Sequence, residues 1–176
     1  LEDYAARDNR MKVIHADENM GTLRARIRGV TEAAGQYVMF VDSDDYLEAS
    51  ACEDLLKQIT EHPVDVLHFG TILHANENVS DNLKGWVTNF LTPYEGGLQG
   101  NLIEKCFVDE MFDFNITNKI WRREVCEKAF ANVEQIRLVA SEDRYNFFII
   151  MYYAKSYYGI AEKYYNYNLG IGITGG

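Results

Sequence analysis

Four acidic side chains lie within seven positions, at Asp42, Asp44, Asp45 and Glu48, directly after the apolar run at 37–41. An apolar run of this length predicts a buried strand, so the carboxylates are expected where that strand ends and a loop begins. Ligands of open α/β sheets bind at that end of the strands. Like charges this close repel one another, and a divalent cation that prefers carboxylate oxygens relieves the repulsion. The sequence therefore predicts a metal site at Asp42 and Asp44.

The acidic cluster also has a structural interpretation, because an aspartate in this place often caps the next helix. Ser50 and Glu53, however, form a capping box that is expected to supply that cap. If the loop stays extended, Asp42 and Asp44 point to the same side and can share a cation, while Asp45 points elsewhere. We therefore favour a functional role for the cluster.

A second polar segment, from Asn19 to Arg26, joins a loop to the predicted start of a helix. Free backbone N–H groups and the helix dipole favour anions there, so this segment, with Gly21, is a candidate substrate contact. On a helical wheel Arg26 lies about 40° from the edge of the apolar stripe, where its stem can pack while its guanidinium reaches a cleft. A snorkelling surface arginine is the alternative.

A third group, Ser141, Glu142 and Asp143, begins another predicted helix. Two acids in a first turn complement the helix dipole, so a structural role by itself explains them. On the wheel Asp143 shares a face with Asn146 and Ile150, which places it beside an apolar wall.

The elements that position these groups follow from periodicity and turn signals. We expect the end of a helix at 1–8, a short strand at 11–15, a helix from Thr22 to a cap at Gly35, the strand at 37–41, a helix to about Glu61 and a strand at 64–73. This order predicts a parallel sheet flanked by helices. Residues 75–100 indicate no more than a loop, and further on we expect helices at 102–112, 122–130 and 141–154 and a strand at 157–167.

Composition limits the function classes. The formal net charge of −10 over 176 residues argues against non-specific nucleic-acid binding. Three widely spaced cysteines are expected to be free thiols, and the longest apolar stretch, at 147–154, is far shorter than a membrane span. The eight tyrosines between 145 and 167 fit core and sheet edge better than a binding platform for a ligand.

Two segments carry a family resemblance. Residues 19–29 resemble the N-x-G-x-x-x-A-R-N-x-G segment of family 2 glycosyltransferases, and residues 34–45 are similar to that family's A-G-x-Y-[IV]-x-F-x-D-S-D-D. Residues 118–124 resemble its weaker N-K-[LI]-[FW]-x-R-E stretch, and Glu142-Asp143 is similar to its E-D pair. Where the family has the asparagine of A-R-N, this chain has Ile27.

The resemblance implies an α/β GT-A fold (nucleotide-diphospho-sugar transferase-like), a mostly parallel sheet flanked by helices. The family's opening strand and its D-D-G-S segment are expected to precede Leu1, so we expect a truncated N-terminus. Residues 1–176 would be one glycosyltransferase domain, with 1–74 as the remaining donor- and metal-binding half and 75–176 as the acceptor-side half.

The resemblance also implies the chemistry. Family members move a sugar from a nucleotide diphosphate sugar to a hydroxyl, here with inversion, and use Mn²⁺ or Mg²⁺. By position, Asp44 would be the main metal ligand, Asp42 would face the ribose or the metal, and Asp143 would be the base, with Glu142 in reserve. The implied substrate-binding residues are Asn19, Gly21, Arg26, Asp42, Ser43 and Asp45.

The implied setting is bacterial surface polysaccharide synthesis at the inner, cytoplasmic face of the membrane, with peripheral membrane association and a saccharide or lipid-linked acceptor. Two alternatives stay open. Haloacid dehalogenase-type phosphatases also place D-x-D after a hydrophobic strand, but they require Thr or Val where Tyr46 stands. The other alternative is a degenerate, non-catalytic transferase domain, which the change at Ile27 and the missing opening segment would suit.

Overall fold

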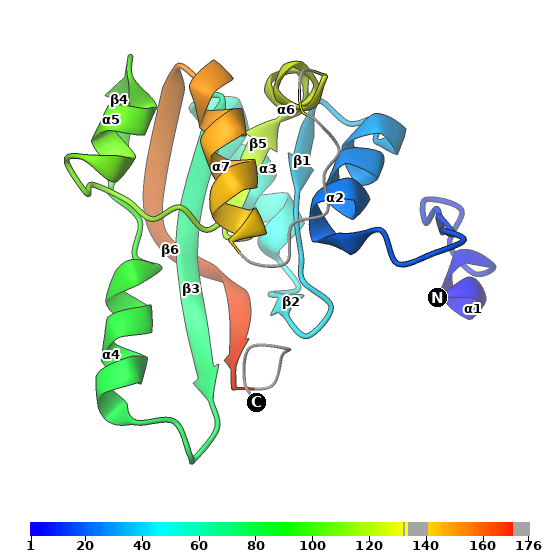
Figure 1. The fold of residues 1–176 in the computed structure, drawn as a ribbon, viewed down its shortest axis with the longest axis horizontal. Helices are drawn as coiled ribbons and strands as arrows, with labels where there is room; N and C mark the ends of the chain where they lie inside the picture. The colour runs from blue at the N-terminus through cyan, green and yellow to red at the C-terminus, as the bar shows by residue number, and fades with distance from the viewer. Residues whose placement is uncertain (132, 134–140, 171–176) are drawn as a thin grey trace.

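A central sheet organises the computed structural model, which describes residues 1–131, 133 and 141–170 (Figure 1). Its strands run in the order β1-β5-β3-β6-β2, and β4 pairs with β6. The strands are β1 (Tyr37–Met39), β2 (Tyr46–Leu47), β3 (Val66–Ala75), β4 (Gly96–Gln99), β5 (Lys119–Arg122) and β6 (Ser156–Leu169). The helices are α1 (Glu2–Ala5), α2 (Gly21–Glu32), α3 (Ala51–Glu61), α4 (Asp81–Phe90), α5 (Leu102–Phe107), α6 (Arg123–Phe130) and α7 (Glu142–Tyr153).

Both faces of the sheet are covered, because neighbouring residues of its central strands point to opposite sides. Val66 packs into a cluster formed with α2, α5, α6 and α7, and Leu67 packs into a second cluster with α3. In β5, Trp121 packs into the first of these clusters and Ile120 into the second. In Figure 1, α7 accordingly crosses in front of the sheet and α3 lies behind it. The expected α/β architecture with flanking helices is therefore confirmed.

The pairing of the strands is mixed, which differs from the predicted parallel sheet. β3 and β6 pair in parallel, whereas β1, β2, β3, β4 and β5 otherwise pair antiparallel with their neighbours. The predicted crossover from β1 through α3 to β3 exists, but β5 lies between the two strands and runs against both. Sequence order gave no sign of this insertion, because β5 comes about fifty residues after β3 begins.

Several local predictions are corrected. Residues 11–15 form no strand among the described residues, and Met11 and Ile14 are exposed rather than packed. The helix α2 ends at Glu32, with Ala33 extended, so Gly35 is not its cap. Ser50 precedes α3 as predicted but makes no side-chain capping bond, because its own backbone is helical. Residues 75–100 contain α4 and β4, which the weak apolar periodicity concealed.

The helix α7 is confirmed, but it is not buried on all sides. Asn146, Phe147, Ile150 and Met151 are buried, whereas Phe148 and Tyr152 are exposed. The cysteines are free thiols, as expected: Cys52 is exposed, and Cys106 and Cys126 are buried. Within the described ranges, none of the helices combines the length and apolar character that crossing a membrane requires.

Candidate functional site

A cavity of about 640 Å³ opens between α2 and β1. Its wall includes Thr22 and Arg26 from α2 and residues 37–43 from β1 and the loop that follows it. β1 is half-buried rather than fully buried and lies at one end of the strand order. The cavity thus brings Arg26, Asp42 and Ser43 together, which are three of the predicted site residues.

Arg26 holds the centre of this site. Its side chain is only 7% exposed, and its guanidinium lies 5.9 Å from the centre of the Phe40 ring. Nη2 donates to Asp42 Oδ1 at 3.1 Å, and Nη1 donates to Asp143 Oδ1. The predicted geometry of a packed stem with its head in a cleft is confirmed, and the snorkelling alternative is not observed. Arg26 joins two acids that lie 101 residues apart in sequence, since Asp42 and Asp143 contact the same guanidinium.

The acidic loop is a turn, not an extended segment. Asp45 N–H donates to the Asp42 carbonyl oxygen at 3.1 Å, which puts Ser43 and Asp44 at the corner. Tyr165 of β6 fastens both ends of this turn: its hydroxyl accepts from Asp42 N–H at 3.2 Å and donates to Asp45 Oδ2 at 2.7 Å. The hydroxyl of Tyr165 is therefore part of the site, and nothing in the sequence beyond a general excess of tyrosine could have indicated it.

The acids of the turn fall into two groups. Asp45 also accepts from Asn168 N–H at 2.8 Å, and Glu48 accepts from Asn166 Nδ2 at 2.8 Å, so both anchor the loop to β6. The carboxylate of Asp44 is exposed and makes no hydrogen bond to any residue the structure describes. Asp44 and the second oxygen of Asp42 therefore make no hydrogen bond to the part of the chain that the structure describes, and they are available to a ligand.

The pKa of Asp42 is shifted mainly by its burial. Burial, together with the charges of Asp143 and Asp45, raises the pKa of the Asp42 carboxyl above its ordinary value. Arg26 opposes this shift but does not cancel it. An added cation would favour the ionised form of Asp42, because a nearby opposite charge offsets the cost of burying the carboxylate.

These carboxylate oxygens suit a divalent ion only if the ion binds together with the phosphates of a substrate. Among the described residues, no group of three or more histidine, cysteine or acidic side chains is arranged to hold a metal. Mg²⁺ is commonly bound through one or two carboxylates plus substrate phosphates rather than by an all-protein cage. Asp44 and the free oxygen of Asp42 supply that smaller set.

The remaining predicted residues are less tightly connected to the cavity. Asn19 Oδ1 accepts from Gly21 N–H at 3.0 Å and so shapes the turn into α2, where Gly21 has a positive φ of 76°. Neither residue lines the cavity, and their substrate contacts stay predictions. Glu142 lies beside Asp143 at the start of α7, where Ser141 makes no capping bond. Ile27 packs in the core at 8% exposure and takes no part in the cavity wall.

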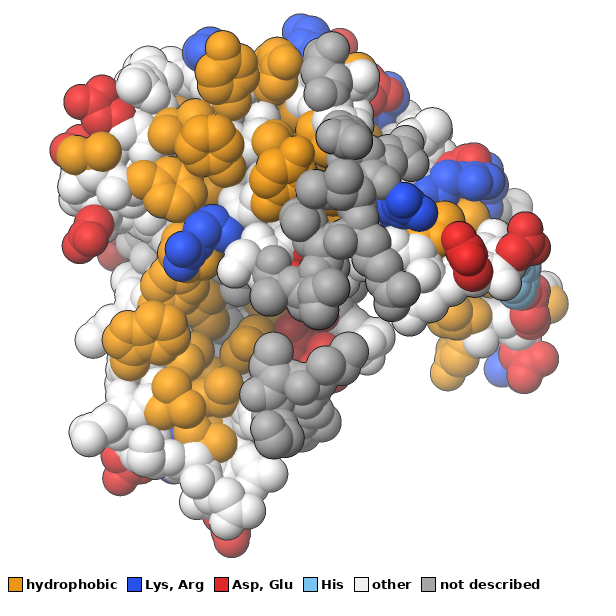
Figure 2. All heavy atoms as spheres, viewed as in Figure 1, with side chains coloured by type: hydrophobic (Ala, Val, Ile, Leu, Met, Phe, Trp, Pro, Cys, Tyr) orange, Lys and Arg blue, Asp and Glu red, His pale blue; other side chains and the backbone are white. Residues whose placement is uncertain are grey.

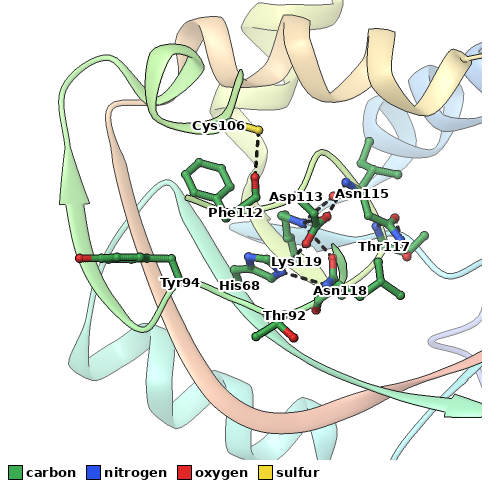
Figure 3. A network of polar contacts seen from close by, with 12 residues as sticks. His68, Thr92, Tyr94, Cys106, Phe112, Asp113, Asn115, Thr117, Asn118 and Lys119 are labelled. Atoms are coloured by element: carbon green, nitrogen blue, oxygen red, sulfur yellow. Dashed lines mark hydrogen bonds and ion pairs between the residues drawn. The ribbon is translucent and has the colours of Figure 1, made fainter. Parts of the chain in front are cut away.

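A second polar centre is fully buried, and the predictions made from the sequence did not include it (Figure 3). Lys119 Nζ donates to Asp113 Oδ1 at 2.9 Å, to the Asn115 carbonyl oxygen at 2.7 Å and to Asn118 Oδ1 at 2.9 Å, which uses all three of its protons. The other side of Asn118 donates to His68 Nε2 at 2.9 Å. The N-K motif at 118–119 therefore forms a buried ionic network rather than a surface of the site.

His68 is neutral in this network. Burial and the charge of Lys119 lower its pKa to about 4, against the opposing effect of Asp113. Because Asn118 donates to Nε2, the ring proton lies on Nδ1 and is donated to the Tyr157 hydroxyl at 2.9 Å. Asp113 Oδ2 then lies 3.1 Å from Nε2 without receiving a hydrogen bond.

The fold has counterparts among known proteins. Crystal structures of Staphylococcus aureus TarS 1–349 superpose with TM-scores of 0.70 for the complex with UDP and 0.71 for the complex with UDP-GlcNAc, at 22% sequence identity. The match to the UDP-GlcNAc complex covers 95% of this chain and 44% of TarS 1–349. The chain thus has the GT-A type of α/β fold.

The sequence comparisons agree. The sequence model of Glycosyl transferase family 2 matches residues 1–130. The putative glycosyltransferase EpsH of Bacillus subtilis (strain 168) is 28% identical over 171 residues, which are 96% of this chain and 47% of EpsH. The putative teichuronic acid biosynthesis glycosyltransferase TuaG of the same organism is 36% identical over 77 residues, which are 44% of this chain and 31% of TuaG.

This chain belongs to glycosyl transferase family 2, since the family match extends over most of its length and includes both the Arg26 segment and the acidic turn. The phosphatase alternative is thereby excluded as the family of this chain. The chain spans about half the length of the curated relative that it matches over almost its whole extent.

Proposed function

We propose that this chain forms the donor-binding and reaction centre of a glycosyltransferase that moves a sugar from a nucleotide diphosphate sugar to an acceptor hydroxyl. The single observation that carries this proposal is the bridge from Arg26 to both Asp42 and Asp143 beside a cavity of about 640 Å³. This bridge supports the proposal because it connects Asp42, a candidate diphosphate contact in the cavity wall, to Asp143, a candidate base. The names of relatives, including the UDP-GlcNAc complex of TarS and the teichuronic acid role of TuaG, favour a nucleotide sugar donor and a bacterial polysaccharide product.

In the proposed reaction the diphosphate lies against Asp42, Ser43 and Asp44. A divalent ion bound there with the donor, Mn²⁺ or Mg²⁺, would stabilise the negative charge on the leaving diphosphate. Asp42 and Asp44 would hold the ion. Burial, with a smaller effect of the charges of Asp143 and Asp45, raises the pKa of Asp42, and a cation nearby would offset that shift. Arg26 would hold the two neighbouring carboxylates in place through its ion pairs with Asp42 and Asp143.

Asp143 is the proposed base on the other side of the sugar. Its carboxylate is 45% exposed, so one oxygen can face an acceptor while the other is held by Arg26. The acceptor hydroxyl loses its proton to Asp143 as its oxygen forms the bond to the anomeric carbon and the bond to the diphosphate breaks. Attack from the side opposite the leaving group inverts that carbon. Glu142 is the alternative base.

Replacing Asp44 by asparagine tests the donor site. Because the Asp44 carboxylate bonds to no described residue, Asp44→Asn should leave the unliganded melting temperature unchanged while removing the Mn²⁺-dependent part of donor binding. Thermal shift with UDP-GlcNAc, with and without Mn²⁺, measures both in the full-length protein. A ligand at one hundred times its Kd stabilises the folded state by about 2.7 kcal/mol.

The matched control is Asp81→Asn, whose side chain is 98% exposed on α4 far from the turn in sequence. It should retain the full Mn²⁺-dependent shift. If Asp44→Asn also retains it, the acidic turn does not hold the metal and the donor site proposed here is wrong.

A further inference from the structure

A second and larger cavity, of about 880 Å³, shares no lining residue with the cavity beside Arg26. It lies between the end of α4, residues 92–95 and residues 106–114. Ligand pockets for small molecules commonly have volumes of about 300–1,000 Å³. Figure 2 shows that hydrophobic side chains gather over α4, α5 and α7 on this face of the molecule. The cavity is therefore a candidate site for a ligand of its own.

The wall of this cavity is aromatic, and no leucine, isoleucine or valine belongs to its described lining. The aromatic lining residues are Trp86, Phe90, Tyr94, Phe107, Phe112 and Phe114. The face of an aromatic ring is the negative part of its quadrupole, so a wall of ring faces attracts cations as well as apolar groups.

Two of these rings keep surface for a ligand. Phe114 is already covered, because the Arg144 guanidinium lies 4.3 Å from its ring centre and Phe90 and Phe107 pack against it. Trp86 stacks on Phe90 with ring centres 5.2 Å apart, yet 61% of Trp86 is exposed, and Tyr94 is 37% exposed. The rings of Trp86 and Tyr94 are therefore the ones that a ligand can contact.

The charges around the cavity have one sign. Glu95, Glu110 and Asp113 belong to the described lining, which contains no lysine, arginine or histidine. Lys119 balances the charge of Asp113 from behind the wall, at 2.9 Å. Glu95 and Glu110 are exposed and form no ion pair with any residue that the structure describes. The cavity thus has two carboxylates whose charge a cationic ligand would complement.

The segment that carries Tyr94 and Glu95 is held in place from behind. The Tyr157 hydroxyl accepts from Tyr94 N–H at 3.2 Å and donates to the Tyr94 carbonyl oxygen at 3.1 Å. A side chain on Gly159 would overlap that same carbonyl, so only glycine permits the close approach. In Figure 3 the Tyr94 ring extends away from the buried network around Asp113. The backbone contacts therefore fix Tyr94 while its ring stays open to a ligand.

We propose that this cavity binds an organic cation, a small molecule that carries a methylated ammonium group on an apolar body. The ammonium group lies against the rings of Trp86 and Tyr94, and Glu95 and Glu110 balance its charge. A methylated ammonium suits this wall because it needs no hydrogen-bond acceptors at fixed positions, and both carboxylates are exposed. The proposed site is separate from the proposed glycosyl transfer.

The test is binding of choline to the full-length protein, measured by saturation-transfer NMR on the methyl protons of the probe. The comparison is 3,3-dimethyl-1-butanol, which has the shape of choline with a neutral carbon in place of the nitrogen. Choline should bind saturably and about tenfold more tightly than this alcohol, because only the cation gains from the ring faces and the carboxylates.

Substitutions in the wall test which groups hold the cation. Trp86→Leu keeps an apolar side chain but removes the ring, and it should weaken choline binding about tenfold. Glu95→Gln and Glu110→Gln should each weaken it about threefold, since a charge pair at an exposed position contributes little. All three residues are exposed, so these variants should fold as the wild type does.

Two control variants match these changes. Asp109→Asn removes the same charge one residue before Glu110, but Asp109 lies outside the described lining. Tyr152→Leu removes a ring that is 62% exposed on α7, also outside this lining. Both should bind choline as the wild type does. Asp44→Asn should also bind it normally, so a failure of the donor site is distinguishable from a failure of this one.

Three results would overturn the inference. They are the absence of saturable choline binding, equal binding of the neutral alcohol, and a loss of affinity in Asp109→Asn or Tyr152→Leu as large as that in the corresponding wall variant.

Discussion

Arg26 shows how a single side chain can connect the parts of a site. Its guanidinium is almost fully removed from water, yet it contacts two acids that are 39% and 45% exposed. A buried arginine is stable only when its charge is paired, so Arg26 fixes the positions of both carboxylates. The acids keep their outer oxygens for a ligand, which is what a donor and an acceptor would need.

At Asp143 we predict a loss of turnover without a loss of donor binding. Asp143→Asn cannot take the acceptor proton but keeps an oxygen for Arg26, so kcat should fall by about 10²–10⁴-fold while the donor Kd stays unchanged. Steady-state kinetics together with donor titration in the full-length protein separates the two effects.

Glu142 provides the comparison, since it is the neighbouring acid of the same helical turn and makes none of the bonds to Arg26. Glu142→Gln should retain turnover. If Glu142→Gln loses turnover and Asp143→Asn retains it, Glu142 is the base and the assignment of Asp143 is wrong.

At the scale of elements, the acidic turn is positioned by β6 rather than by the strand that precedes it. β1 contributes three residues, whereas β6 supplies the Tyr165 hydroxyl and the Asn166 and Asn168 contacts that hold the turn. The carboxylates form one cluster in the sequence but have two roles in the structure. Asp45 and Glu48 bind the turn to β6, whereas Asp44 and one oxygen of Asp42 stay available to a ligand.

We predict that Tyr165→Phe loosens the turn. The change removes a donor to the Asp45 carboxylate, and a hydrogen bond to a charged group contributes about 1.5–3 kcal/mol. The free energy of unfolding in urea should fall by about 2 kcal/mol, and Mn²⁺-dependent donor binding should weaken because Asp42 and Asp44 lose their fixed positions.

Tyr46→Phe is the control for this change. Tyr46 is 49% exposed on β2 and its hydroxyl lies 3.2 Å from His74 Nε2, so its loss should change stability by no more than about 0.5 kcal/mol. Equal losses in both variants would mean that the Tyr165 hydroxyl does not fasten the turn.

At the scale of the molecule, the network of His68, Asp113, Asn118 and Lys119 joins β3, β5 and the segment that follows α5. Lys119 and Asp113 are both fully buried, and a buried charge persists only with its partner in place. The network therefore holds the segment that follows α5 against the central strands β3 and β5.

We predict that the protein loses stability between pH 7.5 and pH 5 because of His68. Its folded pKa of about 4 lies below the ordinary 6.5, so the unfolded chain takes up a proton in this range and the folded chain does not. The contribution is complete above pH 6.5 and is lost as the pH falls toward 4. The loss of unfolding free energy between pH 7.5 and pH 5 is about 2 kcal/mol.

Urea unfolding at the two pH values measures this difference. His68→Asn should be less stable at pH 7.5 but should lose most of the change between pH 7.5 and pH 5. His15→Asn, which removes a side chain that is 78% exposed, should keep the wild-type dependence. An unaltered slope in His68→Asn would show that another group is responsible.

Much of the fold could be predicted from the sequence, because local periodicity determines where α2, α3, β3, α6, α7 and β6 form. The motif text also led correctly to the family. The stripe on α2 left Arg26 between a cleft and the surface, and the structure shows its side chain buried beside the cavity. The polar content of residues 75–100 concealed α4 and β4, and the region 11–15 has a strand-like pattern without a partner strand.

Tertiary structure alone decided which polar groups meet. Three features depend on contacts between distant parts of the chain. They are the position of β5 between β1 and β3, the hydrogen bonds of Tyr165 to the acidic turn and the burial of Lys119. A sequence displays residue types and their local spacing, so it determined that acids follow an apolar strand. It does not display which side chain loses water or finds a partner across the sheet. For that reason only the folded chain separated the acids that anchor the turn from those that stay open to a ligand.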